Sequence, residues 1–93
     1  MRKVSVFGST GSIGVNTLDL LVRQGGAEAF QVVALTGGHN VDLLASQARE
    51  LRAEVAVTAH EDRLPALRAA LHGSGIEAAA GPAALIEAAE RPA

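Results

Sequence analysis

Residues 4–14 read VSVFGSTGSIG, and this stretch decides the fold of the chain. Its β-branched and aromatic start stops at Gly8, which predicts a strand over residues 2–7 that ends in a turn. From Ser12 the apolar residues recur at helical spacing. They form one stripe of Val15, Leu18 and Val22, with Leu21 beside it. The stretch therefore predicts a strand, a glycine-rich turn and a helix in direct succession.

Three further segments have the composition of strands. Residues 30–35 form an apolar run that only Gln31 interrupts, and such a run is typical of a strand buried on both faces of a parallel sheet. Residues 54–58 predict a third strand and residues 76–80 a weaker fourth one. The sequence leaves open where this fourth strand lies in the sheet.

A helix is predicted after each of these strands. Asn40 is a good N-cap for the second helix. Asp62 can cap the third, with Pro65 in the first turn, where a missing N–H costs little. A short fourth helix is expected to start at Pro82 and to run through Glu90. The order of elements is therefore βαβαβαβα.

This regular alternation predicts an α/β fold with a Rossmann-like, doubly wound parallel sheet, right-handed crossovers and helices on both faces. Residues 1–93 are expected to form one small domain. In the doubly wound order a strand from the later half of the sheet lies beside the first strand, and the sequence offers no segment for it. We therefore expect the sheet to be incomplete, with an exposed first strand that favours self-association.

Composition excludes several classes of protein. The chain has 8 Lys and Arg against 10 Asp and Glu, a net charge of -2, and only two aromatic residues, which argues against a nucleic-acid-binding protein. It has no Cys, which removes disulfides, thiolate metal sites and cysteine nucleophiles. No apolar run approaches the roughly 20 residues that a membrane span needs. A cytoplasmic location is expected.

The glycine turn has the spacing of a phosphate-binding loop. Gly8 allows the reversal out of the strand, Gly11 lets a pyrophosphate approach the backbone, and Gly14 allows the helix to pack closely on the strand. The N–H groups of residues 10–13 then point at the anion from a helix N-terminus, and the hydroxyls of Thr10 and Ser12 add donors. A glycine-rich turn without a ligand is the alternative. An ATP-binding P-loop would need Lys at the position of Val15.

The end of the second strand favours NADP over NAD. An NAD site places a carboxylate there to bind the ribose 2′-OH, whereas residues 36–40 read TGGHN and Asp42 already lies in the next helix. A 2′-phosphate near His39 would favour its imidazolium form, so the affinity for NADPH is expected to fall as pH rises. The alternative is that His39 is an exposed loop residue without a ligand.

No catalytic or metal-binding set is predicted. His60, Glu61, Asp62 and His72 are the best candidates for metal ligands, but the first three are consecutive and do not share one face. The spacing of residues supports neither a nucleophile with its base nor a pair of carboxylates. The sequence therefore predicts a cofactor site without a chemical centre.

Taken together, the glycine turn and the segments around it resemble the N-terminal part of the 1-deoxy-D-xylulose 5-phosphate reductoisomerases. The matching stretches are residues 6–14, 17–19, 30–35 and 38–41. The resemblance implies an oxidoreductase of non-mevalonate isoprenoid biosynthesis, which uses NADPH and a divalent metal, Mg or Mn, to convert 1-deoxy-D-xylulose 5-phosphate to 2-C-methyl-D-erythritol 4-phosphate. It also implies a phosphosugar substrate and a homodimer for the full-length enzyme.

Carried over residue by residue, the resemblance assigns two sets of NADPH contacts. On the pyrophosphate side they are Thr10, Gly11, Ser12 and Ile13, and on the adenosine-phosphate side Gly38, His39 and Asn40. Family members often have Lys or another polar residue at the position of His39, and they are several times longer than this chain. The resemblance thus implies a cofactor half-site that ligates no metal and is inactive alone. The alternatives are the NADP-binding domain of an aspartate-semialdehyde dehydrogenase-like reductase and a non-catalytic nucleotide-binding module.

Overall fold

The structure is a computed structural model that describes residues 2–92. Its centre is a four-stranded sheet in which all strands are parallel and lie in the order β1-β2-β3-β4. The strands are β1 (Arg2–Val6), β2 (Phe30–Gly37), β3 (Val55–Thr58) and β4 (Glu77–Ala80). The weak fourth strand, which the sequence left unplaced, therefore pairs with β3 at one edge, and β1 forms the other edge.

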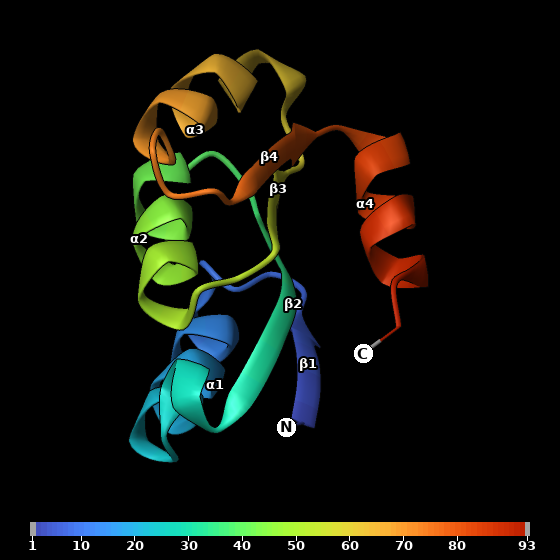
Figure 1. Cartoon of the computed structure of the whole chain (residues 1–93). Helices are drawn as coiled ribbons and strands as arrows, with labels where there is room; N and C mark the ends of the chain where they lie inside the picture. The colour runs from blue at the N-terminus through green and yellow to red at the C-terminus, as the bar shows by residue number, and fades with distance from the viewer. Residues whose placement is uncertain (1, 93) are drawn as a thin grey trace.

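Helices cover both faces of this sheet. They are α1 (Ser12–Arg23), α2 (Val41–Leu51), α3 (Leu64–Ala70) and α4 (Pro82–Glu90). The first three share one face, and α4 lies alone on the opposite face (Figure 1). The predicted βαβαβαβα order, the parallel sheet and the two covered faces are confirmed. The strand order does not reverse within residues 2–92.

Each face of the sheet has its own apolar core. The larger core joins buried residues of α1, α2 and α3 to the sheet, and the smaller one joins Ala88 of α4 to Ala34, Val55 and Val57. All four residues of β3 are buried, as are seven of the eight residues of β2. The prediction of a central strand buried on both faces is therefore confirmed.

The apolar stripe of α1 is buried only in part. Leu18 is 4% exposed, but Val15 and Val22 are each 40% exposed, so the prediction of a continuous inward stripe was wrong at its two ends. These two residues line a groove of about 240 Å³ between α1 and α2, together with Leu43 and Leu51. One helix packed near the edge of a sheet has too few neighbours to cover its whole apolar face.

The helix ends follow from capping, and the end of β2 follows from strand pairing. Asn40 caps α2 as predicted, because its Oδ1 accepts a hydrogen bond from the Leu43 N–H at 3.2 Å. Asp62 does not cap the third helix. It lies in a short 3-10 turn, Glu61–Arg63, and the residue before α3 is Arg63, which makes no side-chain cap. Strand β2 continues two residues beyond its predicted end because Thr36 and Gly37 still pair with β3.

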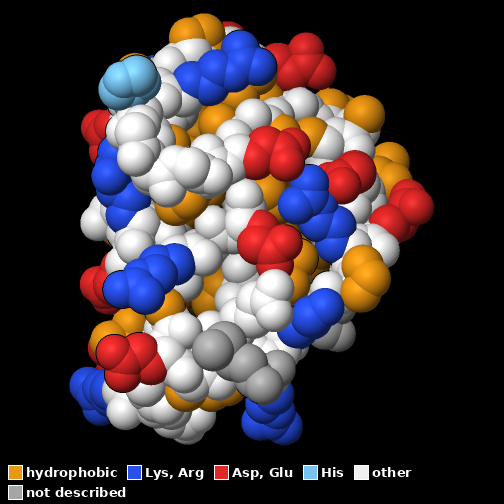
Figure 2. All heavy atoms as spheres, in the orientation of Figure 1, with side chains coloured by type: hydrophobic (Ala, Val, Ile, Leu, Met, Phe, Trp, Pro, Cys, Tyr) orange, Lys and Arg blue, Asp and Glu red, His pale blue; other side chains and the backbone are white. Residues whose placement is uncertain are grey.

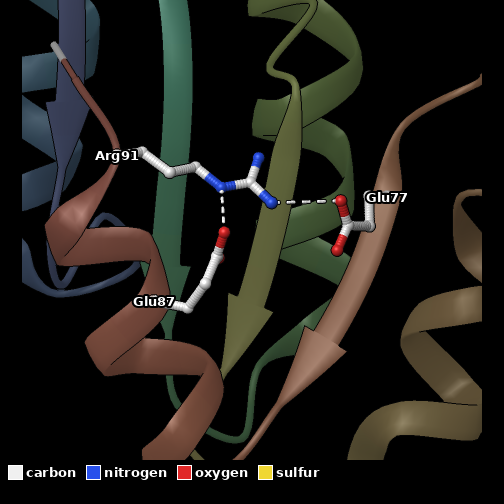
Figure 3. A network of polar contacts seen from close by, with 3 residues as sticks. All are labelled: Glu77, Glu87 and Arg91. Atoms are coloured by element: carbon white, nitrogen blue, oxygen red, sulfur yellow. Dashed lines mark hydrogen bonds and ion pairs between the residues drawn. The ribbon is translucent and has the colours of Figure 1, made fainter.

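Charged side chains of both signs are interspersed over the surface seen in Figure 2. One group ties α4 to the edge of the sheet. Arg91 donates to Glu87 at 2.7 Å and to Glu77 of β4 at 3.1 Å (Figure 3), and these hydrogen bonds raise the pKa of Arg91. Over residues 2–92, no helix combines the length and apolarity that a bilayer crossing requires.

Candidate dinucleotide-binding site

The loops that follow β1, β2 and β3 all leave the sheet at its carboxyl edge, because the strands are parallel. This edge is where open α/β sheets bind ligands. The first loop is the glycine turn, the second begins at Gly38, and the third begins at Ala59. The predicted cofactor residues therefore gather on one side of the molecule.

Two glycines of the first loop are required by its geometry. Gly8 has a φ of +74°, a conformation that L side chains rarely adopt. A Cβ at Gly14 would lie 2.1 Å from the carbonyl oxygen of Gly8, so only glycine lets α1 start this close to the end of β1. The predicted roles of both residues in the turn and in helix packing are confirmed.

The first loop presents backbone donors at the start of α1. The first hydrogen bond of the helix runs from the Val15 N–H to the Gly11 carbonyl at 2.8 Å, so the N–H groups of Ser12 and Ile13 precede it. The Gly11 N–H, however, donates to the Gly8 carbonyl at 3.1 Å. Gly11 therefore offers an approach without a side chain and no free donor, which corrects the expectation that all four N–H groups of residues 10–13 face the anion.

The loop is fixed to the neighbouring elements by a hydrogen-bond network that sequence reasoning missed. The Gly8 N–H donates to Thr36 Oγ1 at 2.9 Å, and the Ser9 N–H donates to the Thr36 carbonyl at 2.7 Å. Ser9 is fully buried; its Oγ donates to Gln47 Oε1 at 2.8 Å, and Gln47 Nε2 donates back to the Ser9 carbonyl at 2.9 Å. A glutamine among the inward-facing apolar residues of α2 was the available signal.

The first and second loops are in direct contact. A Cβ at Gly37 would lie 3.0 Å from two side-chain atoms of Thr10, so the Thr10 side chain packs against the end of β2. Gly38 follows directly, and its carbonyl accepts a hydrogen bond from Thr58 Oγ1 at 2.8 Å. Asn40 uses its Oδ1 as a helix cap. The predicted pyrophosphate and adenosine-phosphate residues thus form one continuous surface.

The third loop joins this surface through His60. The rings of His39 and His60 are stacked, with centroids 3.5 Å apart and planes inclined by 16°, and Arg63 Nε donates to the His39 carbonyl at 3.3 Å. His72 lies beyond the other end of α3. Across residues 2–92, no three His, Asp or Glu side chains come together as metal ligands, so we assign no metal ligand to these residues.

The geometry fits a phosphorylated dinucleotide. The outer side of Gly11 is open, since a Cβ there would meet only the Gly8 carbonyl, at 3.5 Å. The tip of β2 carries no acidic residue, and a carboxylate there is what would select an unphosphorylated ribose. Fold and site together define a dinucleotide-binding α/β protein of the Rossmann type.

Comparison with known proteins gives the family. The 1-deoxy-D-xylulose 5-phosphate reductoisomerase family matches residues 4–93, and the chain belongs to it. Curated reductoisomerases of this name from Cereibacter sphaeroides (strain ATCC 17029 / ATH 2.4.9) and Paracoccus denitrificans are 63% and 64% identical over 93 residues. The match covers all of this chain and 24% of each relative, so the chain spans about a quarter of their length.

Solved structures agree with this assignment. The Zymomonas mobilis enzyme in complex with NADPH is 49% identical, with a TM-score of 0.90 over 95% of this chain and 23% of that one. A second reductoisomerase, in complex with NADPH, fosmidomycin and magnesium, is 27% identical, with a TM-score of 0.88 over 100% of this chain and 22% of that one. The family assignment excludes the aspartate-semialdehyde dehydrogenase-like alternative.

Proposed function

We propose that this chain is the NADPH-binding part of a 1-deoxy-D-xylulose 5-phosphate reductoisomerase. Such an enzyme isomerises and reduces 1-deoxy-D-xylulose 5-phosphate to 2-C-methyl-D-erythritol 4-phosphate. The observation that carries the proposal is the contact between Thr10 and Gly37, which joins the anion-binding loop to a β2 tip without a carboxylate. Membership in the family supports it.

The residues of the first loop hold the pyrophosphate. Ser12 and Ile13 direct backbone N–H groups out of the start of α1, where the helix dipole also favours an anion. Thr10 contributes its hydroxyl and Gly11 the space for close approach. Ile13 is 82% exposed, so its side chain is available to cover the bound dinucleotide.

The residues of the second loop hold the adenosine phosphate. Gly38, His39 and Asn40 follow the tip of β2, where the ribose of a dinucleotide lies in this fold. With no carboxylate to repel it, a 2′-phosphate is accepted, and NADPH is preferred over NADH. When bound, the dihydronicotinamide supplies the hydride for the reduction.

The remaining parts of the proposal concern the whole enzyme. Its phosphosugar substrate and its divalent cation, Mg or Mn, contact segments other than these residues. We also propose a homodimer and a cytoplasmic location. The magnesium and the fosmidomycin found with one solved relative are in keeping with a metal-dependent phosphosugar site.

Fluorescence titration of the protein with NADPH and NADH tests the cofactor assignment. We expect NADPH to bind more than about tenfold more tightly, which corresponds to about 1.4 kcal/mol. A preference for NADH would refute the assignment of the second loop. The absence of binding by either dinucleotide would refute the function itself.

A further inference from the structure

The loop after β3 contacts the loop after β2 through His60 and Arg63. We infer that Arg63 contacts the 2′-phosphate of NADPH and that His60 positions the His39 ring beside it. The inference rests on the proposed function, and it adds residues from a third loop to a site so far built from two. The sequence had suggested His60 only as a weak candidate for a metal ligand.

The position of His60 is fixed from below by a buried hydroxyl. Thr58 Oγ1 donates to the Gly38 carbonyl at 2.8 Å and accepts from the His60 N–H at 3.2 Å, and Thr58 is fully buried. One side chain therefore ties the second loop to the third. A Cβ at Gly38 would lie 3.9 Å from His60 Nε2, so the His60 ring borders the backbone of the second loop.

The stacked rings restrict His39. An exposed imidazole on a loop would otherwise sample several rotamers, and holding it for a ligand would cost conformational entropy. With its centroid 3.5 Å from that of the half-buried His60 ring, His39 has one face covered before any ligand arrives. His60 thus acts through His39, as a positioning residue.

Arg63 supplies a permanent positive charge. Its Nε donates to the His39 carbonyl at 3.3 Å, and within residues 2–92 this is the only hydrogen bond of its guanidinium, so both terminal nitrogens are available. A guanidinium is always charged and matches phosphate oxygens in a two-pronged geometry. Arg63 is the arginine that the structure attaches to the loop of His39.

Two carboxylates directly precede Arg63 in the sequence, and their charges oppose its own. Glu61 packs against Gly81 at the start of α4, since a Cβ there would lie 2.5 Å from Glu61 Oε1. Asp62 is exposed, where water and salt screen its charge. Neither carboxylate forms an ion pair with Arg63 among the described residues.

Adenosine 2′,5′-bisphosphate and AMP are the probes, because they differ only in the 2′-phosphate. Their dissociation constants are measured by calorimetry for the protein and for Arg63→Gln, Arg63→Lys and His60→Ala, with Arg68→Gln on the exposed surface of α3 as the matched control. We expect Arg63→Gln to weaken binding of the bisphosphate about tenfold or more, in keeping with loss of a charge-assisted hydrogen bond. Binding of AMP should weaken less than about twofold. Arg63→Lys should lose less affinity for the bisphosphate than Arg63→Gln, and Arg68→Gln should change neither dissociation constant.

The preference for the bisphosphate is the dissociation constant of AMP divided by that of the bisphosphate. We expect this ratio to fall about threefold in His60→Ala and to recover in His60→Phe, which keeps a stacking ring. The inference is overturned if the ratio of the AMP and bisphosphate dissociation constants is unchanged in both Arg63 variants, that is, if both ligands lose affinity equally or not at all. Circular dichroism checks the fold, and if Arg63→Gln is unfolded, Arg63→Lys decides. If the unsubstituted protein binds neither probe, the proposed function fails; if it binds both and the variants match it, only this inference fails.

Discussion

At the scale of single residues, the glycines of the first loop differ in what they contribute. A Cβ at Gly14 would overlap the backbone of Gly8, whereas a Cβ at Gly11 would stay in ordinary contact distance of it. Gly14 is therefore needed by the fold, whereas we propose that Gly11 is needed by the ligand. The spacing of the glycines revealed the loop, but only the structure shows that a side chain would clash at Gly14 and not at Gly11.

Replacing Gly14 and Gly11 by Ala tests this difference. Gly14→Ala forces α1 away from β1, and we expect it to lower the free energy of unfolding by about 1–3 kcal/mol or more. Gly11→Ala should cost less than about 1 kcal/mol but should weaken NADPH at least about tenfold, since a methyl group occupies the approach of the pyrophosphate. Urea unfolding and NADPH titration measure both. Equal effects of the two variants on unfolding would contradict the assignment.

His39 is expected to make NADPH binding depend on pH. The loop of His39 lies beside the stacked His60 ring and Arg63, and we propose that it receives the anionic 2′-phosphate, so affinity should fall as pH rises from about 6 to about 8.5. His39→Ala should flatten most of this dependence. NADH, which lacks the 2′-phosphate, is the control and should show little change. Parallel pH profiles of the protein and of His39→Ala would refute the role of His39.

At the scale of elements, α2 holds the cofactor loop in place. Gln47 makes two hydrogen bonds to the buried Ser9, and Gln47→Ala leaves both Ser9 groups without these partners. We expect a loss of about 1–3 kcal/mol in the free energy of unfolding, together with weaker binding of NADPH and NADH alike. Ser46→Ala is the control, because it alters a neighbouring exposed position of the same helix and should leave both quantities unchanged. Unfolding of Gln47→Ala at the same urea concentration as the unsubstituted protein would contradict this role.

The contact of α4 with the sheet edge is weaker. Arg91 bridges Glu87 and Glu77, whose side chains are more than half exposed, so Arg91→Ala should cost only about 0.2–1 kcal/mol. Screening predicts that this cost shrinks in high salt. A double-mutant cycle of Arg91→Ala with Glu77→Ala, monitored by thermal unfolding, measures the coupling energy between these two side chains. A coupling that does not depend on salt would contradict an exposed ion pair.

The elements themselves could be predicted from the sequence because apolar runs and helix caps are local properties. Residues 30–35 indicated the buried strand, and Asn40 indicated the start of the second helix. The end of β2 was missed, because Thr36 and Gly37 join the sheet only through pairing with β3. The stack of His39 on His60 was missed for the same reason, since the two residues are far apart in the sequence and no local pattern connects them.

At the scale of the whole molecule, the free edge of β1 is the most vulnerable part of the sheet. Strand β1 pairs with β2 alone among residues 2–92. It ends at Val6, one residue before its predicted end, and the following Phe7 is 52% exposed. We expect the 93-residue polypeptide to self-associate as its concentration rises through the micromolar range. Sedimentation velocity measures this, and Phe7→Lys should shift the equilibrium toward the monomer. A monomer at all concentrations would contradict the expectation.

The isolated position of α4 has a consequence for any longer chain. The three crossover connections, through α1, α2 and α3, each step one strand further from β1 toward β4. Their helices lie on the same face of the sheet (Figure 1), so all three connections have the same handedness. A helix on the other side, joined with that hand, carries the next strand backward across the sheet. The first position open to that next strand is the sheet edge beside β1. The topological switch point would then fall at the glycine turn, where ligands of such sheets collect, so the placement of one helix already determines where the cofactor crevice opens.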